Sequence, residues 1–240
     1  MQEKCIMQKI VWGVGIYSVI LTVSLVGGCF CWIQVVRGKL IITDRTKLFE
    51  AIKKGRLLIV ANHPTLLETV ILQLLMFPRK LVHPRRYFIW CVPSASLFRS
   101  WWGRWLYKSA RCVEINRNDK CSRRRALRSI SAKLKSGETV LVHGEAGRTN
   151  GKLADSPLIN LNGRYMREML FPAARIARIA EADVLPVWFE IPFWENKNDF
   201  KQALWYWIRS GEVITIHIGD VLKSTDNLTQ ENIQTAIMDA

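Results

Sequence analysis

The chain has 240 residues, 49% of them hydrophobic, which suits one globular domain with a full core and a short additional element. Its six cysteines show no C-x-x-C spacing, so the composition excludes a small disulfide-dependent scaffold and favours reduced thiols facing the cytosol. The formal net charge of +15 predicts anionic partners: phosphorylated small molecules, nucleic acid or an acidic bilayer surface.

The first segment is an uncharged, mostly apolar run from Ile10 to Val36. A membrane-spanning helix needs roughly 20 such residues, and Trp12 and Trp32 lie near the two ends, where tryptophan favours the water–lipid boundary. More lysines and arginines follow the run than precede it, which by the positive-inside rule places the rest of the chain in the cytoplasm. We therefore predict a single-pass anchor over residues 1–36 and a domain over residues 37–240, on the cytoplasmic face of a bacterial inner membrane.

Two alternatives to an anchor remain open for this segment. The stretch from Val26 to Cys29 faintly resembles a lipoprotein cleavage box, which would make the segment a cleaved signal peptide. The apolar run continues well past Cys29, however, and does not fit an ordinary signal layout. The other alternative is a buried core helix.

Further along the chain, strand-like and helix-like patterns alternate. Asp44 is a candidate N-cap of a short amphipathic helix that ends at Gly55. The later expected elements are a strand over Leu57–Ala61, a helix over Thr65–Phe77, a strand over Arg86–Val92, a helix over Ser94–Lys108, a strand over Cys112–Ile115, a helix over Arg123–Lys135, a strand over Thr139–Val142, a helix over Ala173–Ala182, strands over Val184–Phe189 and Glu212–Ile218, and a last helix from Gln230. This alternation predicts an α/β domain with a mostly parallel central sheet flanked by helices.

The first candidate site follows the strand over Leu57–Ala61, where Asn62 and His63 precede Pro64 at the expected start of a helix. This places His63 at the carboxyl edge of the sheet, where ligand sites of open α/β folds gather. Glu68 lies within reach of the imidazole, and a carboxylate on one ring nitrogen leaves the other to take a proton from a hydroxyl. The plain alternative is a histidine at a strand end beside an ordinary acid at a helix start.

Two further strands end in similar residues. His143 to Thr149 follow an apolar strand and include Glu145, Gly147 and Arg148, a glycine-containing loop with an arginine whose fork matches phosphate oxygens. Arg117 follows the strand over Cys112–Ile115. Taken alone, each pattern also fits a surface turn, but three such strand ends in one sheet indicate a convergent site.

These blocks resemble the glycerophospholipid acyltransferases, such as the 1-acylglycerol-3-phosphate acyltransferases. That family carries N-H-x-x-x-x-D, a strand ending I-x-R, E-G-T-R, and a V-P or L-P strand, in the same order over roughly residues 57 to 190. The corresponding segments here are Asn62 to Glu68, Ile115 to Arg117, Glu145 to Arg148, and Val184 to Val187.

The resemblance implies that His63 is the general base and Glu68 its orienting partner. It implies that Arg117 and Arg148 bind an acceptor phosphate, that Glu145 shapes this pocket, and that Asn62 and Gly147 belong to the substrate-binding set. The chain departs from the family in having Glu68 in place of the usual Asp, which lipid A acyltransferases also accept. His143 and Gly144 replace the usual Phe-Pro, and Ala146 and Gly147 replace Gly-Thr.

The expected reaction is transfer of a fatty acyl group from a thioester donor, acyl-CoA or acyl-carrier protein, to a lysophospholipid hydroxyl at a phospholipid membrane. A lipid A precursor or amino-lipid acceptor is the alternative, followed by a non-catalytic basic membrane adaptor. We expect no cofactor beyond the donor, no nucleic-acid partner, and no metal, since the four histidines lack ligand spacing. The aromatic and basic segment from Leu97 to Lys108 suits a lipid headgroup region or a core helix. The arginines from Arg123 to Arg128 suit a solvated face, or contact with a carrier protein or nucleotide phosphates.

Overall fold

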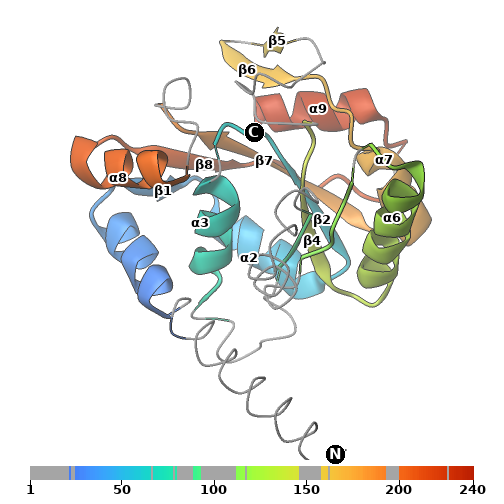
Figure 1. The fold of residues 1–240 in the computed structure, drawn as a ribbon, viewed down its shortest axis with the longest axis horizontal. Coiled ribbons are helices and arrows are strands. Elements are labelled where there is room, and N and C mark those ends of the chain that lie inside the picture. Colours follow the sequence, from blue (N-terminus) through green and yellow to red (C-terminus); the bar gives the residue numbers. More distant parts are fainter. Residues whose placement is uncertain are drawn as a thin grey trace, which may run out of the picture.

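The computed structural model describes residues 22, 25–65, 67–77, 79, 89–92, 112–116, 118–145, 158–161, 163–192, 200–225 and 227–240. These residues form three layers, a central sheet with helices on both faces (Figure 1). The strands are β1 (Leu40–Ile42), β2 (Leu57–Ala61), β3 (Ile89–Cys91), β4 (Thr139–His143), β5 (Leu158–Leu161), β6 (Arg164–Arg167), β7 (Asp183–Glu190) and β8 (Ile214–Ile218). The helices are α2 (Arg45–Lys54), α3 (Leu67–Leu75), α6 (Lys120–Lys135), α7 (Ala173–Ala180), α8 (Phe200–Ser210) and α9 (Gln230–Asp239).

The central sheet has the strand order β1-β8-β7-β2-β4-β3. Strands β7, β2, β4 and β3 run parallel, and β8 is antiparallel to β7 while parallel to β1. Ala61 at the end of β2 is in register with His143 of β4 and Val187 of β7. The carboxyl ends of β2 and β4 therefore meet at one edge of the sheet, as parallel pairing requires.

Alternate residues of the buried strands pack against opposite helix layers. In β2, Leu57, Ile59 and Ala61 lie in a cluster with α2, α3 and α8, whereas Leu58 and Val60 lie in a cluster with α6, α7 and α9. All five residues are buried, which is the pattern of a central parallel strand covered on both faces. The mostly parallel α/β sheet predicted from the sequence is confirmed.

Helix α2 shows how local sequence sets its bounds. The Asp44 carboxylate accepts a hydrogen bond of 2.8 Å from the Lys47 N–H and so caps the first turn. Gly55 ends the helix with φ of 74°, and a Cβ there would lie 2.6 Å from the Gly137 carbonyl oxygen. Only glycine fits this turn, and the helix predicted between Asp44 and Gly55 is confirmed.

Several expected elements differ from the structure. Cys112–Ile115 forms no strand and contains isolated bridge residues, among them Cys112, which pairs with Cys91. Helix α3 begins at Leu67, two residues later than predicted, because the Thr65 hydroxyl accepts a 3.0 Å bond from the Leu67 N–H and caps the turn. Strand β1, helix α8 and the antiparallel hairpin of β5 and β6 were not predicted. The helix expected over Ser94–Lys108 lies outside the described residues.

The predicted membrane anchor lies mostly outside the described residues. Its last part, residues 25–36, is helical and packs on the domain, with Cys31 and Gln34 buried and Phe30 edge-on to Trp207 at 5.7 Å. Within the part of the chain that the structure describes, no helix combines the length and apolar character needed to cross a bilayer.

Candidate active site

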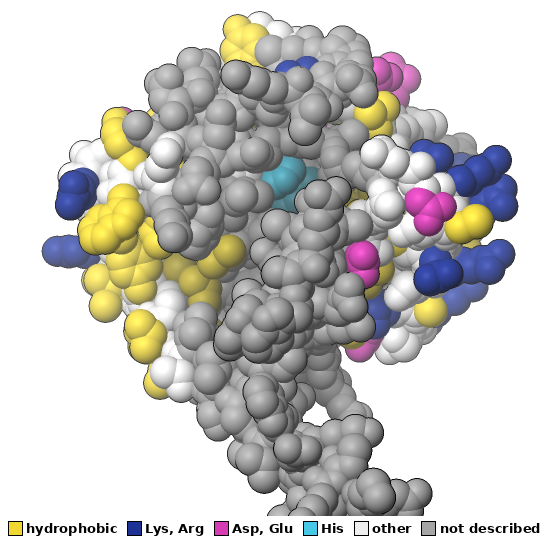
Figure 2. Space-filling view, viewed as in Figure 1, with side chains coloured by type: hydrophobic (Ala, Val, Ile, Leu, Met, Phe, Trp, Pro, Cys, Tyr) yellow, Lys and Arg dark blue, Asp and Glu magenta, His cyan; other side chains and the backbone are white. Residues whose placement is uncertain are grey.

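The candidate site lies where β2 and β4 end. Because Ala61 is in register with His143, the residues after β2 lie beside those after β4, and the Gly144 N–H bonds the Ala61 carbonyl at 3.0 Å. Figure 2 shows a histidine side chain in a hollow near the centre of this face. The sheet thus brings together two segments about 80 residues apart in sequence, at the edge where open α/β folds bind ligands.

His63 and Glu68 form a hydrogen-bonded pair. The Nδ1–H of His63 donates to the Oε1 atom of Glu68, which lies in the first turn of α3. The other Glu68 oxygen, Oε2, accepts from the Thr65 hydroxyl at 2.9 Å. Because Nδ1 carries the proton, Nε2 of the neutral ring has the lone pair that a general base needs.

Glu68 is a buried anion held by its neighbours. Its side chain is 0% exposed, while that of His63 is 14% exposed, so the imidazole is the accessible member of the pair. Burial alone raises the pKa of Glu68, but the attraction of His63, its hydrogen bond and the smaller attraction of His143 outweigh burial and hold the pKa below the ordinary value of 4.5. The site therefore keeps a fixed negative charge beside the His63 ring.

Glu145 holds the backbone of His63. Its Oε1 accepts from the His63 N–H at 2.7 Å, and its Oε2 accepts from the Arg167 N–H at 3.0 Å. The carboxylate is 1% exposed and joins the ends of β2, β4 and β6. These two bonds fix the position of the His63 main chain, and the role predicted for Glu145 in shaping the phosphate pocket stays a prediction.

Asn62 ties β2 to β7. Its side-chain nitrogen donates to the Phe189 carbonyl at 3.0 Å, and its oxygen accepts from the Phe189 N–H at 2.7 Å. The residue is 1% exposed. This bonding favours a positioning role for Asn62, next to the base, over the substrate contact expected from the sequence.

His143 is a site residue that the sequence analysis left unassigned. Its ring stacks on that of His63, with centroids 4.1 Å apart and planes inclined by 13°. Its Nδ1–H donates to the Asn62 carbonyl at 2.9 Å, so in the neutral ring Nε2 accepts from the Thr69 hydroxyl at 2.7 Å. The sequence does contain a signal for His143, because it lies at the end of one buried strand, β4, just as His63 lies shortly after the end of another, β2.

His63, Glu68 and His143 also lie close enough to suggest a metal centre, with ligand atoms within 4.8 Å of one another. The stacking argues against one. Nitrogen lone pairs lie in the ring plane, and two nearly parallel rings 4.1 Å apart cannot direct theirs to one ion. In addition, Nδ1 of His63 faces a carboxylate, and both nitrogens of His143 have protein partners. The arrangement fits proton transfer better than metal ligation.

The remaining predicted site residues, Arg117, Gly147 and Arg148, lie outside the described residues. Phosphate binding by the two arginines stays a prediction.

Comparison with known proteins gives a family and a similar fold. The sequence matches the acyltransferase family model over residues 42–190, more than half of the chain and including both strand ends of the site. The chain belongs to the acyltransferase family. The fold is similar to that of PlsC, the 1-acyl-sn-glycerophosphate (LPA) acyltransferase from Thermotoga maritima, with a TM-score of 0.58 and 15% identity, covering 90% of this chain and 77% of that one. A search of curated proteins gave no match.

The family resemblance drawn from the motif blocks is therefore confirmed, and so is the expectation of an acyltransferase enzyme. At 15% identity, the likeness to PlsC shows similarity of fold alone.

Proposed function

We propose that this acyltransferase moves a fatty acyl group from a thioester donor, acyl-CoA or acyl-carrier protein, to the hydroxyl of a lysophospholipid such as 1-acylglycerol-3-phosphate. The observation that carries the proposal is the pair of His63 and Glu68, with the proton on Nδ1 and a buried anion behind it. Such a pair activates a hydroxyl acceptor directly, without a nucleophilic residue of the protein.

The reaction follows from this geometry. Nε2 of His63 takes the proton of the acceptor hydroxyl as its oxygen attacks the thioester carbonyl carbon, and Glu68 stabilises the resulting imidazolium. The carbon–sulfur bond then breaks, the thiolate leaves, and the imidazolium returns the proton to the sulfur. The products are the ester and the free thiol, and His63 is restored.

The acceptor class rests on Arg117 and Arg148, which the motif blocks assign to phosphate binding and whose guanidinium forks suit phosphate oxygens. PlsC from Thermotoga maritima is a 1-acyl-sn-glycerophosphate acyltransferase, which supports the same acceptor for this chain. A lipid A precursor is the second candidate, because lipid A acyltransferases accept Glu at the position of Glu68.

We further propose that the enzyme works at the cytoplasmic face of the membrane, anchored by residues 1–36. The support is the apolar run from Ile10 to Val36 and the excess of basic residues after it. A lipid acceptor requires the site to lie near a bilayer, which agrees with this placement.

The test is a product assay on purified protein in mixed micelles, with labelled acyl donors offered against a panel of lysolipids. His63→Ala should lower turnover by about two to four decades, the range given by loss of a general base. His217→Ala is the matched control, because His217 also bonds a glutamate, Glu190 at 2.8 Å, and is 19% exposed. Its turnover should stay near that of the wild type. Normal turnover of His63→Ala would refute the assignment of the base.

A further inference from the structure

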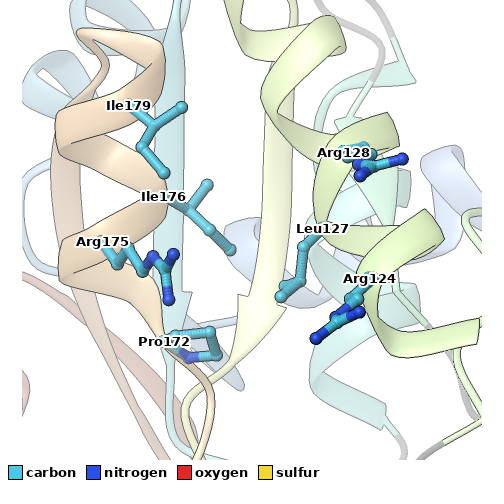
Figure 3. Close-up of a pocket in the computed structure, with 7 residues that line it drawn as sticks. All are labelled: Arg124, Leu127, Arg128, Pro172, Arg175, Ile176 and Ile179. Atoms are coloured by element: carbon cyan, nitrogen blue, oxygen red, sulfur yellow. The ribbon is translucent and has the colours of Figure 1, made fainter. Parts of the chain in front are cut away.

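His143 has no part in the proposed reaction, but it is fixed beside the proposed base. Side chains of β4 alternate between the two faces of the sheet, so His143 and Leu141 face α3. Val140 and Val142 face α6 and α7, and the pocket that these two helices line lies on that opposite side (Figure 3). The Thr69 hydroxyl of α3 donates to Nε2 of His143 at 2.7 Å. The His143 ring is therefore held on the face of the sheet that carries the site.

The peptide bond between Asn62 and His63 is held at both of its polar ends. Nδ1–H of His143 donates to the carbonyl of this peptide, that of Asn62, at 2.9 Å. The N–H of the same peptide, that of His63, donates to the Glu145 carboxylate at 2.7 Å. The His143 ring also stacks on the His63 ring, with centroids 4.1 Å apart and planes inclined by 13°. His143 thus contacts His63 twice, through the main chain and through the ring.

Two departures of this chain from the motif blocks supply hydrogen bonds to the segment before His63. His143 and Gly144 stand where those blocks usually have Phe-Pro. The Gly144 N–H donates to the Ala61 carbonyl at 3.0 Å, and a proline has no N–H for such a bond. A phenylalanine ring could stack on His63, but it has no donor for the Asn62 carbonyl. The bond from His143 to the peptide of His63 is therefore a feature of this sequence.

The charge of His143 during transfer follows from its neighbours. Among the described residues, the titratable groups that face its ring are His63, which stacks on it, and Glu68, whose carboxylate lies within 4.8 Å of a His143 nitrogen. Glu145, two residues further along, faces the His63 N–H. Two cationic rings stacked at 4.1 Å would repel each other, so His143 is neutral when His63 takes up a proton. The neutral ring keeps its bonds to Thr69 and to the Asn62 carbonyl.

We propose that His143 is a positioning residue for acyl transfer, which holds the ring of His63 by stacking and its peptide bond by hydrogen bonding. The inference rests on the proposed function, because His143 acts through the proposed base. Nε2 of His63 must meet the acceptor hydroxyl within hydrogen-bond distance, and misplacement by about 1 Å can cost about a hundredfold in rate. The effect of His143 therefore falls on kcat, while the KM values for donor and acceptor stay unchanged.

Steady-state kinetics of the full-length protein in mixed micelles, with the donor and acceptor of highest turnover in the product assay, test the proposal. His143→Ala removes both the ring and its N–H, and should lower kcat by about a hundredfold. His143→Phe keeps a ring, and His143→Asn keeps an amide N–H in the place of Nδ1, so each should lose about tenfold, half of that effect on a logarithmic scale. Asp44→Ala is the control for stability, because it removes the cap bond to the Lys47 N–H at the start of α2. Its kcat should equal that of the wild type.

A double-mutant cycle separates positioning of His63 from a general structural role. If His143 acts through His63, His143→Ala should lower the residual turnover of His63→Ala by less than about twofold, whereas a general role gives the same loss in both backgrounds. The proposal would be overturned by such an equal loss, by a raised KM with unchanged kcat, or by a fall in the kcat of Asp44→Ala like that of His143→Phe. It would also be overturned if His63→Ala lost turnover while His143→Ala kept it, and the proposed function would still stand. Wild-type turnover of His63→Ala would instead refute the proposed function.

Discussion

Replacing Glu68 by Gln isolates the role of the buried charge. Glutamine has the same shape, and its amide oxygen still accepts the Nδ1–H of His63, while its NH₂ group faces Thr65. The Thr65 oxygen already accepts from the Leu67 N–H and has a second lone pair for the new donor. The side chain stays buried, so the substitution removes the negative charge and leaves the packing unchanged.

The magnitude follows from the charge on the imidazolium. A carboxylate about 4 Å from the centre of this charge stabilises it by about 4 kcal/mol at an effective dielectric constant of about 20. The remaining hydrogen bond to the glutamine oxygen contributes about 1 kcal/mol. The difference of about 3 kcal/mol appears only when His63 becomes charged, so kcat should fall by about a hundredfold.

The assay is steady-state turnover at saturating donor and acceptor, with far-UV circular dichroism to confirm the fold. Glu190→Gln is the control, because Glu190 bonds His217 at 2.8 Å but its side chain is 60% exposed. Its turnover should equal that of the wild type. If Glu68→Gln turned over as fast as the wild type, the buried charge would have no part in catalysis and Glu68 would be only an acid in the first turn of α3.

The wild type and Glu68→Gln should also differ in how their stability depends on pH. The folded-state pKa of Glu68 lies below its ordinary value of 4.5, so the unfolded chain binds the proton more tightly. The stabilisation by Glu68 is therefore complete above pH 4.5 and is lost as the pH falls through the lower, folded-state pKa. Relative to Glu68→Gln, the wild type should lose free energy of unfolding in urea as the pH is lowered below 4.5. A difference independent of pH would contradict the charged state assigned to Glu68.

Two further predictions concern the neighbours of the base. His143→Phe keeps a ring against His63 but leaves the Asn62 carbonyl and the Thr69 hydroxyl without this partner, so the free energy of unfolding should fall by about 1–3 kcal/mol; unchanged stability in urea would contradict the bonds assigned to His143. Glu145→Gln leaves one oxygen for the N–H groups of His63 and Arg167, so it should destabilise by a similar amount, about 1–3 kcal/mol, and also lower kcat; normal kcat in a destabilised variant would limit Glu145 to a structural role.

The predictable part of the fold is the part specified by local pattern. Buried strands such as Leu57–Ala61 are continuous apolar runs, and α2 has its cap at Asp44 and its end at Gly55, so both can be found from neighbouring residues. Strand β1 has three residues and forms only by pairing with β8, whose direction is reversed relative to β7. No local signal specifies such pairing, because the partner strand is about 170 residues away in sequence.

The candidate site likewise has one part that local sequence predicts and one part that depends on strand pairing. His63 and Glu68 lie five residues apart, so the strand-to-helix turn alone brings them within reach. The contact of His143 with Asn62 spans 81 residues and depends on the register of β2 against β4. A shift of one residue in that register would turn His143 to the other face of the sheet, away from His63. The stack is therefore a property of the assembled sheet.

Burial shows how the molecule uses its polar residues. Among the described residues, the buried polar side chains are Gln34, Asn62, Thr65, Glu68, Thr139 and Glu145. Four of these six contact His63, its partner Glu68 or the adjoining strand ends, and each forms hydrogen bonds inside the protein.

Burying polar groups costs stability unless they are fully bonded, and bonded networks in a core hold their members in one arrangement. Here the bonds surround His63, which remains accessible. Asn62 holds β2 to β7, Glu145 holds the His63 main chain to β6, and Glu68 holds the His63 ring, so backbone and side chain are restrained independently. A general base must meet its substrate hydroxyl within hydrogen-bond distance at the moment of attack, and a residue whose main chain and ring are both held loses little entropy in doing so. Asn62, Thr65, Glu68 and Glu145 are thus best explained by the positioning of His63.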